Sequence, residues 1–264
     1  MSGESWIAPW RRAWLAALGL LVLAFLVLPV FIVLPMSFSD SQYLEFPPRA
    51  WSLRWYRAYL GSDEWMSATR VSLAAAFLTT LLATPLGLAA AYGLHRAGGR
   101  AARLARAALV APLVVPVIIL AIGVFYLYVR LGLVNTMAGL VLAHTALALP
   151  FVVVLVDAGL RRIDLDQERV ARSLGASPLR AFATVVLPQL ERSLLAAALL
   201  AFVTSLDEVV VALFVSGGEM STLTRRMFTG LRDQVDPTIA AISSLLILLS
   251  VGLLGGAQLL LRRR

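Results

Sequence analysis

Long apolar runs separated by short polar segments dominate the chain. A helix needs about 20 mainly apolar residues to cross the roughly 30 Å hydrocarbon core of a bilayer. Six stretches meet this requirement, at about 14–36, 69–94, 107–129, 135–158, 193–215 and 238–261. The first follows Arg11 and Arg12 as a secretion signal does, but it is too long for a signal core and no small-residue cleavage site follows it. The pattern therefore predicts an all-α, polytopic membrane protein with six transmembrane helices in one domain, residues 1–264.

The composition indicates that lipid surrounds much of the chain, and it argues against several kinds of binding and catalytic site. Hydrophobic residues make up 60% of the chain and charged residues 14%, with a mean hydropathy of +0.85, whereas soluble domains carry about 25% charged residues. All 23 basic residues are arginine, so the chain lacks the lysine of a phosphate-binding GxxxxGK(S/T) loop and does not bind ATP in that way. With no cysteine, and His95 and His144 as the only histidines, little remains for metal sites or catalytic triads.

The arginines predict the orientation of the chain. Six spans put both termini on one side, and positive residues in short loops stay in the cytoplasm. One side holds eight arginines and the other fifteen. Because the arginines lie between apolar runs and not in one patch, membrane topology explains the net charge of +8 better than nucleic-acid binding does. We therefore expect both termini and segment 161–192 in the cytoplasm, and loops 37–68 and 216–237 outside. The larger set is Arg11, Arg12, Arg96, Arg100, Arg103, Arg106, Arg161, Arg162, Arg169, Arg172, Arg180, Arg192 and Arg262 to Arg264.

The first external loop is rich in aromatic residues, which have two interpretations. Aromatic side chains at a lipid boundary usually act as interfacial anchors. The alternative is a docking surface for an external partner. The residues concerned are Trp51, Trp55, Tyr56, Tyr59 and Trp65.

Segment 161–192 interrupts the apolar pattern with signals typical of two short helices. Asp164 is the expected N-cap of the first helix, with Gln167 as its capping-box partner. Gly175 stands where a glycine would stop that helix. Ser177 followed by Pro178 would then start the second helix.

The second helix has one apolar stripe, formed by Leu179, Phe182 and Val186 at spacings of three and four. The pattern alone leaves two interpretations open. One is an amphipathic helix that lies in the lipid headgroups, and the other is a helix that docks on another protein.

The same segment resembles the EAA loop of ABC-importer permeases. That motif reads Glu-Ala-Ala, three residues, Gly, nine residues, a branched aliphatic residue, any residue, Leu-Pro. The motif's glutamate falls on Arg169 and its first alanine on Val170, while Glu168 lies one residue early and is a candidate for the missing acid. The other positions match at the same spacing and are Ala171, Gly175, Val185, Leu187 and Pro188.

The likeness extends over nearly the whole chain and is to the spermidine/putrescine type of binding-protein-dependent permease. The stretches that carry it are "RVSLAAAFLTTLLATPLGLAAAYGL", "GLVLAHTALALPFVVV", "SLDEVVVALFVSG" and "DPTIAAISSLL". The resemblance implies a type I ABC-importer (MetI-like) permease fold in a bacterial inner membrane. It also implies half of a translocation pathway for a small solute, with a polyamine as the leading candidate.

The resemblance further implies partners and a coupling site. In that family the loop helix docks into a groove of a separate ATPase, so ATP and Mg would bind the ATPase and no cofactor would bind this chain. The expected partners are an ATP-binding cassette ATPase dimer, a second, non-identical permease subunit and an extracytoplasmic substrate-binding protein. The residues expected to couple to the ATPase are Glu168, Ala171, Gly175, Ala176, Leu179, Phe182, Leu187 and Pro188.

Polar residues inside the apolar stretches are further candidates. Asp207 and Glu208 fall about midway along the fifth stretch, and ionised groups near the bilayer centre usually face a bundle interior or a wet cavity. They are either a cation-attracting site on the substrate pathway or an interhelical hydrogen-bond pair. For His144 we favour a hydrogen-bonded packing role over that of a ligand. Asp157 is expected to pair with Arg161 at i+4.

Three functional classes compete. An importer permease accounts for segment 161–192, whereas a secondary transporter or channel has no need of a docking helix. A membrane-embedded enzyme is the poorest fit, because no histidine pair, cysteine or clustered polar triad is available. Among importers, an opine, an aminophosphonate, thiamine or ferric ion are alternative solutes, because the binding protein sets much of the selectivity.

Overall fold

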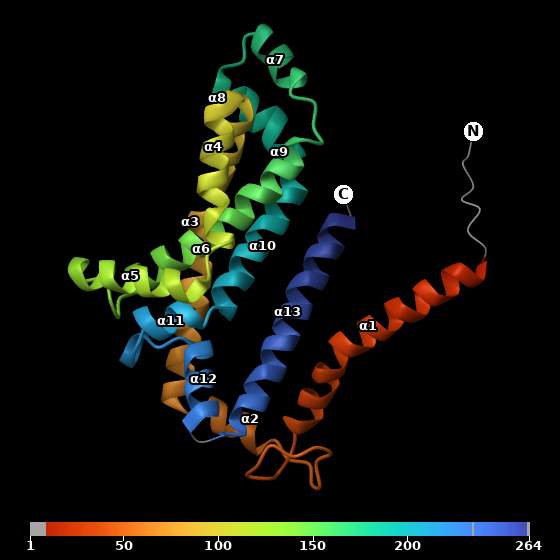
Figure 1. Cartoon of the computed structure of the whole chain (residues 1–264), viewed down its shortest axis with the longest axis vertical. Helices are drawn as coiled ribbons and strands as arrows, with labels where there is room; N and C mark the ends of the chain where they lie inside the picture. The colour runs from red at the N-terminus through yellow and green to blue at the C-terminus, as the bar shows by residue number, and fades with distance from the viewer. Residues whose placement is uncertain (1–8, 234, 263–264) are drawn as a thin grey trace. The chain divides into compact units, whose positions relative to one another are not determined.

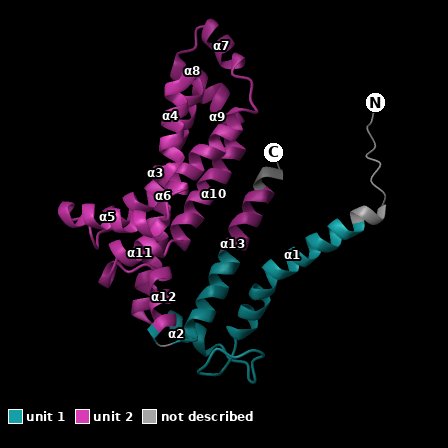
Figure 2. Cartoon of the chain, in the orientation of Figure 1, with its two compact units in different colours: residues 1–61, 233–249 teal, residues 62–232, 250–264 magenta. Residues whose placement is uncertain are grey.

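Helices form nearly all of the computed structural model, which describes residues 9–233 and 235–262 (Figure 1). Contacts group the chain into two compact units, residues 1–61 with 233–249 and residues 62–232 with 250–264 (Figure 2). Across the described ranges, extended structure is limited to a bridge between Ser39 and Trp51. The all-α prediction is confirmed. Arg263 and Arg264, two of the arginines used for the orientation, lie outside the described residues.

The first unit joins the end of one long apolar helix to a short helix and to the start of another long one. The helices are α1 (Pro9–Met36), α2 (Arg54–Leu60) and the first half of α13 (Thr238–Arg262). The Tyr56 hydroxyl connects all three, because it lies 2.8 Å from Ser37 Oγ and 2.6 Å from Ser244 Oγ. The most apolar part of α1 buries no residue within the chain, so lipid or another subunit must cover it.

The aromatic residues of the loop predicted to be external, 37–68, and of the start of α3 divide between surface and interior. Trp51 is exposed, while Tyr59 and Trp65 are buried within the protein. The guanidinium of Arg226 lies over the Trp65 ring at 5.3 Å from its centroid. Tyr59 and Trp65 therefore pack inside the protein, and the interpretation as lipid anchors does not hold for them.

Three helices pack together as the core of the second unit, α3 (Asp63–Ala97), α6 (Met137–Leu160) and α10 (Glu191–Asp207) (Figure 1). Small residues allow their backbones to approach closely. A methyl group at Gly87 would lie 2.4 Å from Val152 Cγ1, and one at Gly159 would lie 2.3 Å from Ser193 Oγ. Alanines that are fully buried line the rest of the contact, namely Ala83, Ala91, Ala148, Ala197 and Ala201.

The predicted stretch 107–129 is not one straight helix. It is divided between α4 (Gly99–Val110), a short 3-10 turn at Ala111–Leu113 and α5 (Val117–Leu131), and the bend between the two arms is 98°. Pro112 and Pro116 cause the break, because proline has no backbone N–H and its ring clashes with the preceding helical turn.

The predicted stretch 193–215 is also divided. Helix α10 ends at Asp207, and the chain continues through α11 (Val210–Val215), a short 3-10 turn at Gly218–Met220 and α12 (Leu223–Asp233). The Leu223 amide donates to Ser72 Oγ at 2.8 Å, which ties the start of α12 to α3.

Four described helices, α1, α3, α6 and α13, are long and apolar enough to cross a membrane. Two bent pairs bring the number to six if each pair counts as one span. One pair is the 98° bend at the end of α4, and the other joins residues 178–189 to α10 at 76°.

Candidate functional site

Segment 161–192 begins with helix α7 (Asp166–Ser173), which ends in a glycine turn. Gly175 has a φ of +93°, a conformation that side chains with a Cβ adopt only at a cost. Its amide donates to the Arg172 carbonyl at 3.0 Å, and the Ala176 amide donates to the Ala171 carbonyl at 3.1 Å. These two bonds form a Schellman motif. The predicted glycine stop is confirmed.

A second helical run follows the turn, made of α8 (Pro178–Ala181), a π-helical turn (Phe182–Val186) and α9 (Leu187–Gln189). It starts as predicted, because Ser177 Oγ accepts the Arg180 amide at 3.3 Å and Pro178 takes the first helical position. The predicted single apolar stripe is wrong. Leu179 is 77% exposed while Val186 is 1% exposed, because a π-helical turn adds a residue and changes which face follows it.

The predicted capping box at the start of α7 is also wrong. The helix begins at Asp166, and Asp164 Oδ1 accepts the Asp166 amide at 2.9 Å from outside the helix. Gln167 Oε1 accepts instead from Gln189 Nε2 at 3.2 Å. This bond joins the first and last turns of the segment.

Glu168 holds the segment on the end of α3. Its side chain is 2% exposed, and its carboxylate accepts the Tyr92 hydroxyl at 2.8 and 2.9 Å and Arg96 Nη1 at 2.5 Å. A buried carboxylate is tolerated when a cation and hydrogen bonds compensate it. The Phe182 ring packs on the Tyr92 ring with centroids 4.7 Å apart. Two parts of the segment therefore meet α3 at Tyr92.

The predicted coupling residues do not share one environment. Glu168 faces inward, so it is placed to anchor the segment rather than to touch a partner. The exposed members of the set are Gly175, Leu179 and Pro188, and the half-buried members are Ala171, Ala176, Phe182 and Leu187.

Three large apolar side chains stand exposed on the segment. Val170 is 57%, Leu174 83% and Leu179 77% exposed. We call these three residues the apolar triad. Arg169, Arg172 and Arg180 are exposed beside them in the chain. The sequence prediction named only Leu179, although the pair Val170 and Leu174 at a spacing of four was readable as one helical face.

Tyr92 and Arg96 are the other residues that the sequence prediction missed. They lie one turn apart near the end of α3, and Glu168 is 72 residues beyond Arg96. No local pattern connects positions that far apart. Only the packing of the segment on α3 brings them together.

Asp207 and Glu208 lie at a break between helices and not in the middle of one. Asp207 is exposed at the last turn of α10. The Glu208 carboxylate accepts the amides of Val211 at 2.9 and 3.1 Å and of Ala212 at 3.1 Å. Glu208 thus satisfies the free amides at the start of α11. The premise of a continuous helix through both acids is wrong.

The short helix α11 is fixed at both ends. Arg225 of α12 donates to the Ala212 carbonyl at 3.2 Å, and Thr224 Oγ1 donates to the Glu208 carbonyl at 2.8 Å. Burial lowers the pKa of the Arg225 guanidinium, although arginine remains charged at neutral pH. The break that carries the two acids is therefore connected to α12 by side-chain bonds.

The two remaining polar candidates have hydrogen-bonding roles. His144 is buried and its Nδ1 lies 2.7 Å from Ser205 Oγ of α10, as the packing interpretation predicted. Asp157 accepts from Arg161 at 2.9 Å, as predicted, and also from Arg106. Within residues 9–233 and 235–262, no group of three His, Cys, Asp or Glu residues is arranged to hold a metal ion.

The fold has a solved counterpart. It is similar to a chain of a bacterial ABC transporter involved in the import of the acidic polysaccharide alginate, with a TM-score of 0.68 at 14% sequence identity. The match covers 98% of this chain and 99% of that chain. The chain therefore shares its fold with a chain of that transporter.

Sequence comparison identifies a family as well as a fold. Residues 83–264 match the binding-protein-dependent transport system inner membrane components. The chain is 34% identical over 252 residues to the putrescine transport system permease protein PotI of Escherichia coli (strain K12), covering 93% of this chain and 89% of that protein. It is 30% identical over 243 residues to the spermidine/putrescine transport system permease protein PotC of Haemophilus influenzae, covering 92% and 94%.

The chain belongs to the family of binding-protein-dependent transport system inner membrane components. It is a permease subunit of an ATP-driven importer and not an enzyme. The expected likeness to the spermidine/putrescine type is confirmed.

Proposed function

We propose that this chain forms half of the translocation pathway of a polyamine importer and is driven by a separate ATPase dimer through segment 161–192. The observation that carries the proposal is the apolar triad, displayed on a segment that is itself anchored. Burying a Val or Leu side chain contributes about 1.5–3 kcal/mol. Three such side chains are exposed on one short, anchored segment, and a partner surface that covers them explains why they are there.

The anchor supplies a route from the docking surface into the bundle. Glu168 connects α7 to α3 through Tyr92 and Arg96. Val186 and Leu190, at the other end of the segment, are buried in the core formed by α3, α6 and α10. A displacement of the triad would therefore move α3 and α10 with it.

The proposed orientation of the chain is based on its arginines. We place both termini and segment 161–192 in the cytoplasm, where the ATPase is, because the larger set of arginines lies on that side. Loops 37–68 and 216–237 then face an extracytoplasmic substrate-binding protein. The second of these loops contains α12, whose bonds to Glu208 and Ala212 give the outer face a connection to the acid-bearing break.

The rest of the pathway requires a second permease subunit. One chain supplies up to six spans, and exposed apolar side chains of α5 such as Ile119 and Leu127 offer a surface for a membrane neighbour. The family resemblance favours a non-identical partner. ATP and Mg belong to the ATPase in this arrangement, since the chain has no lysine for a phosphate-binding loop.

The polyamine assignment rests on the named relatives and on Asp207. Putrescine and spermidine are polycations, and PotI and PotC are named as transport permeases for them. Asp207 is exposed and free of hydrogen bonds to the described residues, whereas Glu208 is occupied by the amides of α11. We therefore assign the cation contact to Asp207 and the shaping of the break to Glu208.

Uptake of labelled putrescine tests this assignment. Asp207→Asn should raise the KM for uptake roughly tenfold, because a hydrogen bond to a charged group contributes about 1.5–3 kcal/mol. Glu208→Gln should instead lower the amount of assembled complex. Glu219→Gln, an exposed acid on the outer loop, is the matched control and should transport normally. Normal KM in Asp207→Asn would remove that carboxylate from the pathway.

A further inference from the structure

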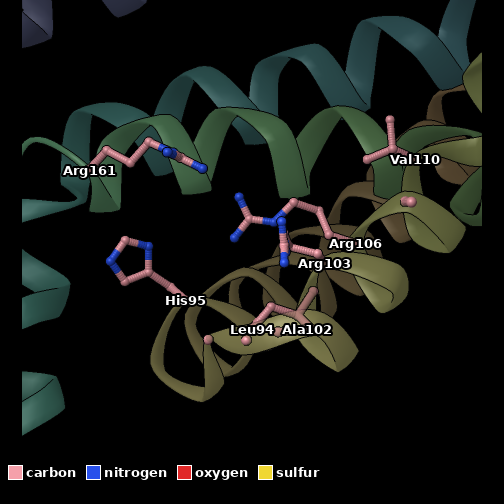
Figure 3. A pocket seen from close by; sticks show the side chains of 10 residues that line it. Leu94, His95, Ala102, Arg103, Arg106, Val110 and Arg161 are labelled. Atoms are coloured by element: carbon pink, nitrogen blue, oxygen red, sulfur yellow. The ribbon is translucent and has the colours of Figure 1, made fainter.

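A basic cavity of about 680 Å³ lies between the end of α3, helix α4 and the end of α6 (Figure 3). Arg103 and Arg106 reach it from α4, His95 from α3, and Arg161 from the turn after α6. The guanidinium groups point into the same space in Figure 3. None of these residues belongs to segment 166–189, which carries the apolar triad.

The cavity has an excess of positive charge. Asp157 pairs with both Arg106 and Arg161, which fixes the two guanidiniums at its edge. Arg103 is exposed and forms no ion pair within the described part of the chain. Three arginines therefore face one carboxylate.

This arrangement suits a phosphate group. Arginine presents a planar fork of N–H donors that matches phosphate oxygens. Two of the three forks are already oriented by Asp157, so less side-chain freedom is lost when an anion binds. The ligand chemistry is therefore a phosphate monoanion or dianion.

The size, walls and position of the cavity favour a lipid as the source of that phosphate. Its volume is many times the roughly 30 Å³ of a water molecule and lies in the range of about 300–1,000 Å³ typical of ligand pockets. The remaining walls are apolar, from Leu94, Ala102, Ala107 and Val110. It also lies where the candidate spans α3 and α6 end.

We propose that this cavity binds the phosphate of an anionic glycerophospholipid, with the start of an acyl chain along the Ala107–Val110 wall. Basic pockets between transmembrane helices at a membrane surface bind such headgroups. The lipid would brace α4 against the ends of α3 and α6. The inference goes beyond the transport function proposed above and does not depend on it.

Lipid titration of the full-length, delipidated protein, followed by native mass spectrometry, tests the proposal. Wild-type protein should bind phosphatidylglycerol more tightly than phosphatidylcholine. Arg103→Gln should weaken phosphatidylglycerol binding roughly fivefold, the factor that corresponds to about 1 kcal/mol per arginine near an anionic surface. Arg100→Gln is the matched control, since it removes the same charge from the same helix outside the cavity, and it should leave binding unchanged.

Two further measurements complete the test. One distinguishes a lipid phosphate from free phosphate, and the other tests whether the cavity itself holds the lipid. Excess inorganic phosphate should not displace phosphatidylglycerol, and Ala107→Trp should reduce lipid binding by filling the apolar part without changing the charge. The proposal is overturned if inorganic phosphate displaces the lipid, if the two lipids bind equally, or if Arg100→Gln and Arg103→Gln weaken binding to the same extent. Wild-type affinity in Arg103→Gln or Ala107→Trp also overturns it.

Discussion

A shift of one residue in the position of a carboxylate decides how segment 161–192 is held. Arg169 stands where the EAA motif has its glutamate, and it is exposed and pairs with Asp166 at 2.5 Å. Glu168 comes one residue earlier, about 100° around the helix, and this rotation points it at α3. The acid of this chain is therefore an anchor, and its partners are in the same chain.

Replacing Glu168 tests the anchor. Glu168→Gln should loosen α7 from α3, because Tyr92 and Arg96 lose the carboxylate that both donate to. Hydrogen bonds to charged groups contribute about 1.5–3 kcal/mol each, so amide hydrogen exchange in α7 should accelerate by roughly tenfold or more.

Asp166→Asn is the matched control for this exchange measurement. It also removes an acid from α7, but its pair with Arg169 is exposed, and such pairs contribute about 0–1 kcal/mol. Equal exchange rates in Glu168→Gln and wild-type protein would show that the carboxylate does not hold the segment.

Much of the chemistry of single residues was readable in the sequence, but their partners were not. Ser177, Pro178 and Gly175 act within a few positions of themselves, so their places as helix cap, first helical residue and glycine turn were predicted correctly. The contact between Glu168 and Tyr92 spans 76 residues. It depends on how α7 folds back on α3, which no local pattern encodes.

At the scale of elements, the turn after α7 sets the direction in which α8 leaves it. The Schellman bonds at Gly175 and Ala176 close α7, and the Ser177 cap starts α8 at once. The apolar triad has members on both sides of this turn, Leu174 before it and Leu179 after it. The geometry of the proposed docking surface therefore depends on a positive φ at Gly175.

Gly175→Ala should disturb that surface. A Cβ in the left-handed region costs about 1–2 kcal/mol per residue, while the space beside Gly175 is open, so strain rather than a clash is the cause. Limited proteolysis of the purified importer should cut within residues 173–178 several times faster than in wild-type protein, and uptake should fall.

Gly93→Ala is the control for the substitution itself. Gly93 is helical, exposed and has open space beside it, so alanine there should be neutral or stabilising by up to about 1 kcal/mol. Wild-type proteolysis of Gly175→Ala would mean that the turn tolerates a side chain and does not fix the surface.

The elements themselves were only partly predictable. The apolar runs predicted the four long helices α1, α3, α6 and α13, because each run has about 20 or more mainly apolar residues in succession. The breaks were not placed. Prolines 112 and 116 signal an interruption of a helix, but they do not give the size of the bend, which is 98°. The end of α10 at Asp207 has no proline or glycine to mark it.

At the scale of the whole molecule, the chain has a packed helical bundle and several apolar surfaces that nothing in the described part of the chain covers. The α3, α6 and α10 core buries small residues throughout, whereas α1, much of α5 and the apolar triad remain exposed in the isolated chain. A membrane and partner subunits account for these surfaces. The proposed partner of the triad is the ATPase, so removing the triad should separate transport from ATP hydrolysis without unfolding the bundle.

Co-purification of the ATPase with this chain tests the central claim most directly. A tagged chain, expressed with its partner subunits, should recover the ATPase, and Leu53→Ser, an exposed leucine outside segment 161–192, should recover the same amount. Leu174→Ser with Leu179→Ser should weaken the association by roughly a hundredfold, since each leucine contributes about 1.5–3 kcal/mol. Full recovery of a coupled ATPase by that double variant, or transport by an assembly of this chain alone, would contradict the account.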